Sequence, residues 1–420
     1  MNASDVLWIL FFLSVGTASL WLSRQWYRQP ISPLSIYIGI NSFSLALYHL
    51  RLVRLRQISG GTYLVVIISF ISFFVGASLY GPLTARGRRQ APRLPNFKGL
   101  DGFFYLTVLV STVGWTVPLY ILVQRYGLDF LLSNLWVLQP EFQMKYLGYL
   151  NVLGIAVLPT FLIRRTLGRS RRFDILLVGS SLIGLVLAGI KTYFIYSLVV
   201  SVILYALYRL NRLSIKHFFV IFLVFTIILV FFVSYDATID IFSAVQLPGS
   251  SLPESLAFFE RPYVYFVGSW PAMDILVSDQ AHPSQPIFGY VTLQPLWKIL
   301  GDGLGLIEPV PPYLPAVDIT STEFNVYAFI GEVYWDFGLA GVVLLSLTFG
   351  LITTRLYLKA RSGSSWVDKL LYAMVGYLLA ISFFSYFLRF ETVVLILYVY
   401  IVGRLLSWNS SRMVPQIHAA

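Results

Sequence analysis

Apolar runs separated by short polar turns cover most of the chain. A membrane-spanning helix needs about 20 consecutive, mostly apolar residues, and eleven runs come near that length. They cover residues 5–23, 33–50, 62–82, 103–124, 147–163, 174–190, 192–208, 217–234, 328–354, 370–388 and 391–407. The pattern predicts an all-α polytopic membrane protein with about 11 transmembrane helices, forming a single membrane domain over residues 1–420.

One long segment, residues 235–327, interrupts this pattern because it is polar. It holds more than half of the 19 acidic residues and of the 20 prolines, but only two basic residues, Arg261 and Lys298. Long loops are usually functional or disordered, and the many aromatic residues of this one argue against disorder. We therefore expect a structured loop between the eighth and ninth helices, with short helices near 255–278 and 291–300.

Composition agrees with a membrane protein and excludes several other classes. The chain is 57% hydrophobic and 12% charged, whereas soluble domains carry about 25% charged residues. It has no cysteine, and its four histidines lack the spacing of metal ligands, so neither a metal nor another cofactor is expected. The net charge of +11 reflects basic loops at a membrane surface, so we expect no nucleic-acid partner.

The distribution of basic residues predicts the orientation. Most of the 30 lysines and arginines lie in loops that follow odd-numbered runs, and cytoplasmic loops carry such an excess. The N-terminus and the long polar loop should then lie outside, and the C-terminus inside. The loops around Arg88 and Arg169 are especially basic, which is typical of contact with anionic lipid headgroups. Arg51, Arg54 and Arg56 run against the pattern, because they follow the second run.

The start of the ninth run carries polar residues at helical spacing. Residues at i, i+4, i+7 and i+11 share one helix face. One such face combines Asn325, Phe329, Glu332 and Asp336, and a second combines Tyr327, Gly331, Tyr334 and Gly338. Carboxylates inside an apolar helix are costly and usually functional. The alternative is that acids near a helix N-terminus complement its dipole, which accounts for Glu323 better than for Asp336.

Few basic residues lie on the predicted outer side. Arg261, Lys191 and Arg389 are among them, and arginine suits bidentate contact with phosphate. Together they suggest an anion site, although Glu260 and Glu391 offer local partners. The acidic, aromatic loop suits neutral sugars, which stack on aromatic rings and bond to carboxylates. An ordinary structured loop with buried aromatic residues remains the alternative.

Three stretches combine Tyr, Pro, Asp and Gly in a recurring order. They read YVYFVGSWPAMD (263–274), FGYVTLQPLWKILGDGLGL (288–306) and NVYAFIGEVYWDFGLAGVVLLSLTFGLITTRLY (325–357). In these stretches, about a quarter of its length, the chain resembles the Wzy-type O-antigen polymerases, which polymerise oligosaccharide repeat units of bacterial surface polysaccharides. Ala328 stands where that family often has Thr, and Lys191 stands where it often has Arg.

The resemblance implies a metal-independent membrane glycosyltransferase with a GT-C-like architecture. Such an enzyme acts at the periplasmic face of the bacterial inner membrane, where the 235–327 loop would then lie. Its donor and acceptor would both be oligosaccharides linked to undecaprenyl pyrophosphate, surrounded by membrane lipids. A chain-length regulator would be an optional further partner.

Site roles follow from combining this resemblance with the charge pattern. Arg261, Arg389 and Lys191 would neutralise the departing pyrophosphate. Glu323 or Asp336 would orient the acceptor hydroxyl or accept its proton. The remaining predicted substrate contacts are Tyr265, Asn325, Tyr327, Tyr334 and His282.

Three other functions stay open. An O-antigen ligase would rely on a His and an Arg in the outer loop, where His282 is the loop's histidine. A flippase for lipid-linked oligosaccharides would usually show two similar halves and charges along a channel, and neither pattern is visible in the sequence. A membrane scaffold would have no need for Asp336 within an apolar helix.

Overall fold

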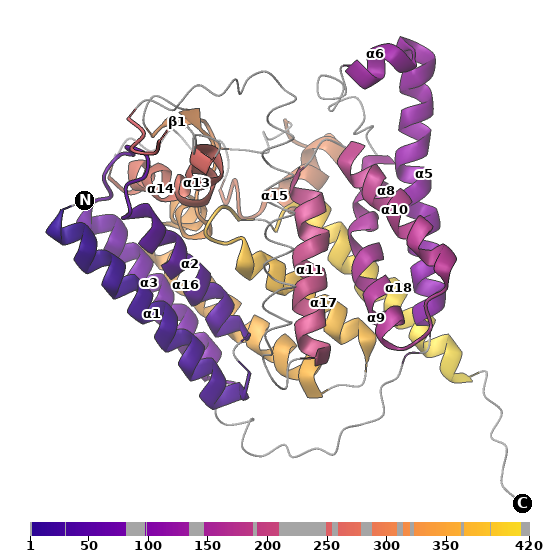
Figure 1. The fold of residues 1–420 in the computed structure, drawn as a ribbon, viewed down its shortest axis with the longest axis horizontal. Coiled ribbons are helices and arrows are strands. Elements are labelled where there is room, and N and C mark those ends of the chain that lie inside the picture. Colours follow the sequence, from indigo (N-terminus) through magenta and orange to yellow (C-terminus); the bar gives the residue numbers. More distant parts are fainter. Residues whose placement is uncertain are drawn as a thin grey trace, which may run out of the picture. The chain divides into compact units, whose positions relative to one another are not determined.

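A computed structural model represents the chain (Figure 1). It describes residues 2–29, 31–80, 97, 99–133, 147–187, 191–209, 249–253, 259–278, 288–308, 314–319, 323–362, 365–386 and 388–412. The chain divides into two compact units, each assembled from segments far apart in the sequence. Unit 1 comprises Met1–Arg89, Leu229–Tyr357 and Leu378–Phe390, and unit 2 comprises Gln90–Ile228, Leu358–Tyr377 and Glu391–Ala420.

Unit 1 begins with three long helices that lie side by side (Figure 1). These are α1 (Ala3–Tyr27), α2 (Pro33–Tyr48) and α3 (Gly60–Ser78). The polar segment adds α13 (Glu260–Val267), α14 (Ser269–Ser278), α15 (Gln294–Lys298) and the π-helical turn η3 (Ile299–Gly303). Strands β1 (Val317–Asp318) and β2 (Glu323–Phe324) pair antiparallel before α16 (Phe329–Ser362) begins.

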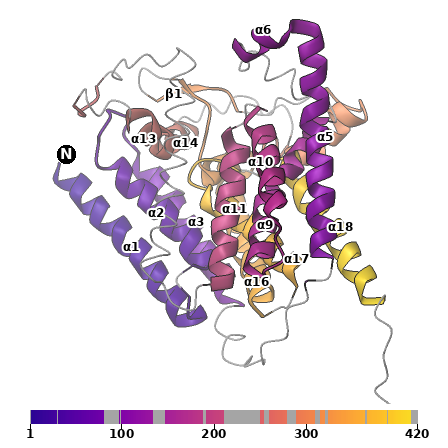
Figure 2. The same cartoon turned by 45° about the vertical axis from the view of Figure 1, so that its right-hand side comes forward.

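Unit 2 is a second helical bundle. Its N-terminal helices are α5 (Leu100–Tyr126), α6 (Leu128–Ser133), α8 (Leu147–Val152), η1 (Leu153–Ala156) and α9 (Val157–Thr166). They are followed by α10 (Arg172–Leu187), α11 (Lys191–Arg209), most of α17 (Trp366–Ala380) and α18 (Phe390–Arg412). Helices α9, α10 and α11 run beside one another (Figure 2).

The helical membrane class predicted from the apolar runs is confirmed. Within the described ranges, six helical segments are long and apolar enough to cross a membrane: Ala3–Tyr27, Gly60–Ser78, Leu100–Tyr126, Leu147–Thr166, Phe329–Ser362 and Phe390–Trp408. Each predicted run overlaps a helix, except 217–234, which lies outside the described residues. The count of about 11 spans stays a prediction. The single-domain organisation and the loop bounds 235–327 stay predictions.

Two local predictions about helices were wrong. The run 370–388 was expected to be helical throughout, but α17 ends at Ala380 and a turn follows. The turn is held in place because the backbone N–H of Phe329 donates to the carbonyl of Ser382 at 2.8 Å. Asn325 was placed on a helix face, yet the backbone becomes helical only at Phe329. The intervening residues continue from β2 as irregular chain.

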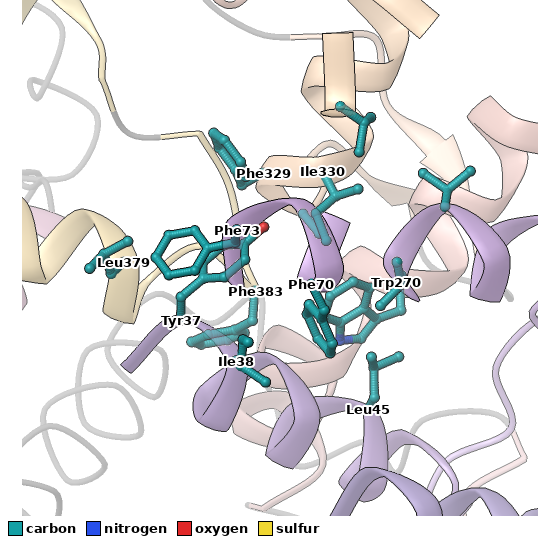
Figure 3. Packing of buried hydrophobic residues seen from close by; sticks show 14 of the residues in the cluster. Tyr37, Ile38, Leu45, Phe70, Phe73, Trp270, Phe329, Ile330, Leu379 and Phe383 are labelled. Carbon is teal, nitrogen blue, oxygen red and sulfur yellow. The ribbon is translucent and has the colours of Figure 1, made fainter. Parts of the chain in front are cut away.

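The core of unit 1 joins the long helices to the polar segment. Figure 3 shows Tyr37 and Leu45 of α2, Phe73 of α3, Trp270 of α14 and Phe329 of α16 gathered in this core. Trp270 is fully buried, and its indole N–H donates to Ser44 Oγ at 2.8 Å. The polar segment is therefore packed onto the helices as part of the same core.

Helices α3 and α16 approach closely through small residues. A Cβ on Gly76 would clash with the carbonyl oxygen of Leu347, and one on Gly350 would clash with that of Phe73. Between them, Ser69 Oγ lies 2.8 Å from Ser346 Oγ. Small residues and interhelical hydroxyl bonds are typical of helix packing in membranes.

One basic loop has a structural role besides its predicted contact with lipid headgroups. The Arg164 side chain is buried in unit 2, and its guanidinium pairs with Asp101 at 2.7 Å and Asp174 at 2.9 Å. Tyr105 accepts a further N–H from it at 3.1 Å. The bonds join the starts of α5 and α10 to the end of α9, so these three ends lie together, as the alternating orientation requires.

The close contact between α3 and α16 predicts that substitution by alanine has very different effects on stability at two glycines. Gly76→Ala should destabilise the protein by about 1–3 kcal/mol, because the added methyl group overpacks the interface. Gly179→Ala in α10, where a Cβ meets nothing within 4 Å, should be neutral or stabilising, because alanine favours the helix. Thermal unfolding of both variants in detergent checks this. Equal melting temperatures would contradict the close approach.

Candidate functional site

The first two turns of α16 form a short helix separated from the long one that follows. Gly338 has φ 60° and ψ −158°, which interrupts the helical backbone. Positive φ is readily adopted by glycine and is strained for residues with a Cβ. The chain can therefore change direction at Gly338, between the short helix Phe329–Phe337 and the apolar helix that follows. Glu332 and Asp336 both lie on this short segment, and both are buried.

Asp336 binds the loop that precedes α15. Its Oδ2 accepts the backbone N–H and the hydroxyl of Thr292, each at 2.6 Å. The N–H of Val291 lies 3.2 and 3.1 Å from the two carboxylate oxygens. A carboxylate satisfied by this many donors is a strong structural acceptor. The geometry thus indicates a positioning role for Asp336, and the proton transfer assigned to it stays a prediction.

Glu332, one helical turn earlier, binds the loop that follows α17. Ser385 donates its hydroxyl to Oε1 at 2.6 Å, and the N–H of Tyr386 donates to Oε2 at 3.0 Å. Arg389 donates to the same Ser385 hydroxyl. Glu332 and Asp336 therefore attach two separate loops to one short helix.

Two cations of unit 1 lie beside the start of α18. The Arg389 guanidinium is half-buried and donates to Ser385 Oγ at 3.4 Å. The Lys298 ammonium lies 5.7 Å from the centre of the Phe390 ring, and the N–H of Phe390 donates to Gln294 Oε1 at 3.1 Å. Arg389 directly precedes Phe390, so α15 and the loop after α17 meet at Phe390.

Aromatic residues line the same loops. The Tyr265 ring lies 6.3 Å from that of Phe324 and 6.0 Å from that of Phe384. Tyr386 stacks on Phe329 at 5.5 Å, and its hydroxyl donates to the carbonyl of Thr292 at 3.4 Å.

The other predicted tyrosines have different surroundings. Tyr327 is buried and donates its hydroxyl to the carbonyl of Pro315 at 2.6 Å. Burial also raises the pKa of Tyr327. Tyr334 is half-buried and packs against the core of unit 1. Asn325 is exposed, which leaves its amide accessible to a ligand.

The remaining predicted residues are placed only in part. Arg261 lies on α13 and Glu323 on β2, but only their backbones are described. Lys191 is the first residue of α11 and belongs to unit 2. His282 lies outside the described residues. Of the predicted cations, the structure therefore describes the side-chain surroundings of Arg389.

The sequence analysis missed a buried polar network in unit 1. His49 Nδ1 lies 3.0 Å from Asp5 Oδ1, and His49 Nε2 lies 2.9 Å from the Tyr63 hydroxyl. Arg51 donates to the same Asp5 oxygen at 3.2 Å. Asp5, His49 and Tyr63 come from α1, the end of α2 and α3, so no local motif identifies them. The only signal in the sequence was that Asp5 lies at the start of one predicted helix and His49 at the end of the next.

The same region accounts for the arginines that run against the charge pattern. Arg51 pairs with Asp5, and Arg56 Nε lies 3.4 Å from Asp274 Oδ2. Asp274 also accepts the N–H of Ser59 at 2.7 Å, just before α3 begins. The backbone N–H of Arg54 donates to the carbonyl of Gly249. These residues thus attach the polar segment to the ends of the N-terminal helices.

Comparison with protein-family models, with curated proteins and with solved structures found no match. Function is therefore argued from the site itself. Within the described ranges, no three His, Asp or Glu side chains gather as a metal site requires. The arrangement offers two cations, Arg389 and Lys298, on segments that meet at Phe390, together with aromatic side chains on the same loops and carboxylates that hold these loops.

The bonds of Asp336 predict a local effect of mutation. Asp336→Ala removes the acceptor for two backbone amides and one hydroxyl, and each unmet donor costs about 1–3 kcal/mol. We expect much faster hydrogen exchange at the amides of Val291 and Thr292, measured by mass spectrometry in detergent. Asp302→Ala, at an exposed position on η3, is the matched control. Unchanged exchange at residues 291–292 in Asp336→Ala would show that Asp336 does not hold this loop in place.

Proposed function

We propose that this chain is a membrane glycosyltransferase that polymerises lipid-linked oligosaccharide repeat units. The growing glycan leaves its undecaprenyl pyrophosphate carrier and is joined to the next lipid-linked unit. The observation that carries the proposal is that the loop bearing Arg389 and the helix bearing Lys298 meet at Phe390, among aromatic side chains. A pyrophosphate joining a lipid to a sugar needs a cationic site at that boundary.

The division of roles follows from the contacts. Arg389 interacts with the departing pyrophosphate, and Lys298 adds a second charge to the same region. Glu332 positions Arg389 because it binds the neighbouring Ser385 and Tyr386. Asp336 positions the loop leading to Lys298 through Thr292 and Val291.

Most of the remaining sequence predictions keep their roles in the proposal. Arg261 also contacts phosphate, and Glu323 orients the acceptor hydroxyl. The phosphate contact of Lys191 stays a prediction from the sequence. Tyr265, Asn325 and Tyr334 contact sugars, and the buried Tyr327 supports the loop through its bond to Pro315. The reaction is metal-independent, and the protein has about 11 spans in a GT-C-like architecture, with its site on the periplasmic face of a bacterial inner membrane.

Two related functions give different phenotypes in cells that lack the chain. Loss of a polymerase leaves single repeat units on the surface lipid. Loss of a ligase leaves long polymer on its carrier, and loss of a flippase leaves single units on the cytoplasmic side. An electrophoretic gel of extracted glycans separates these outcomes. Long carrier-bound polymer in the deletion strain would contradict the polymerase proposal.

Arg389 is the most direct mutational test. Arg389→Ala should reduce polymer formation by about 10²–10³-fold, because it removes a charge that stabilises the leaving group. Arg389→Lys should restore part of the activity, since it keeps the charge but loses bidentate geometry. The control is Arg24→Ala, an exposed position in the last turn of α1. Normal polymer from Arg389→Ala, at equal protein abundance, would refute the role of Arg389.

A further inference from the structure

The segment from Phe288 to Leu306 buries polar side chains and exposes apolar ones. Thr292 and Gln294 are buried, and both are hydrogen-bonded. The exposed large side chains are Phe288 (68%), Leu293 (36%), Leu296 (46%), Ile299 (45%), Leu304 (62%) and Leu306 (70%). A structured loop in water normally shows the reverse arrangement, and a contiguous apolar surface marks an interaction site.

Specific bonds fix this orientation. Leu293, Leu296 and Ile299 are three residues apart, so they share one side of the helical turn. On the inner side, Thr292 is bound to Asp336 and Gln294 accepts the N–H of Phe390. The segment cannot rotate to bury its leucines without breaking these bonds, so the apolar face is a stable feature.

The exposed face continues onto a predicted membrane helix. The Phe288 ring meets that of Phe337 at 5.0 Å, and Phe337 directly precedes the helix break at Gly338. Beyond the break, Leu339 and Leu344 are 42% and 65% exposed on an apolar helix long enough to cross a membrane. The apolar surface of the segment therefore adjoins a surface that lipid is expected to cover.

Two residues of the segment favour a position at the lipid–water boundary. Trp297 has an indole N–H within 3.1 Å of the carbonyl of Phe288, and the half-buried Lys298 follows it. Indole rings and long cationic side chains typically lie at that boundary, with apolar neighbours pointing inward.

We propose that Phe288–Leu306 is an interfacial membrane segment whose leucine face is immersed in the acyl chains of bilayer lipids. The segment lies on the membrane and does not cross it. This inference does not rest on the proposed glycosyltransferase activity, since it follows from exposure and bonding alone. It places the loop attached to Asp336, and Lys298 with it, at the depth of the lipid headgroups.

The absence of cysteine makes single-cysteine labelling a clean test. Leu296→Cys, Leu304→Cys and Leu306→Cys are each reconstituted in phosphatidylcholine nanodiscs and treated with a charged maleimide. The water-exposed control is Ser251→Cys, and the lipid-facing control is Leu344→Cys on α16. We expect the three test positions to react at least about tenfold more slowly than position 251, since thiol reactivity requires access to water. Labelling after denaturation in detergent normalises the rates.

A second measurement identifies what covers the segment. A bimane fluorophore on positions 304 and 306 should be quenched by lipids that carry a nitroxide near the top of the acyl chain, as at position 344. Fast maleimide labelling would overturn the proposal, because the face would then lie in water. Slow labelling without quenching by lipid would also overturn it, because protein would then cover the face.

Discussion

Buried carboxylates at the start of α16 are the constraint on which the surrounding structure depends. A buried charge without partners is very unfavourable, so Glu332 and Asp336 must each recruit donors. Their donors are backbone and hydroxyl groups of two loops distant in sequence. Each loop is thereby fixed relative to the short helix. Removal of either carboxylate releases the donors of a whole segment, whereas loss of a single donor leaves the others in place.

These hydrogen bonds suggest different roles for the acidic side chains and for the basic side chains. Carboxylates in an apolar helix first suggest chemistry, yet Asp336 is occupied by three donor groups. The cations are the better candidates for substrate contact, because the loops held by Glu332 and Asp336 bring Arg389 and Lys298 beside Phe390. In the proposed function, the cations on these loops bind an anion, and the carboxylates keep the loops in place.

The apolar runs were sufficient to predict nearly every helix, because a membrane-spanning helix needs an apolar length that few other structures share. The spacing of Glu332 and Asp336 within an apolar run also identified the start of α16 as unusual for a membrane helix. Sequence could not predict the end of α17 at Ala380, since a bond from the Phe329 amide sets it. The pairing of Asp5 with His49 was equally hidden, because 44 positions separate the two residues. Tertiary contacts determine both features, and local periodicity contains no signal for them.

The most direct test of the account is an assay with purified protein in liposomes, supplied only with lipid-linked repeat units. A polymerase working through protein cations should produce a ladder of lengthening lipid-linked glycans, and the ladder should persist when EDTA removes divalent metal ions. Products that never exceed one repeat unit, from protein that is folded and correctly inserted, would contradict the central claim. A ladder abolished by EDTA would contradict the proposed reliance on cationic side chains.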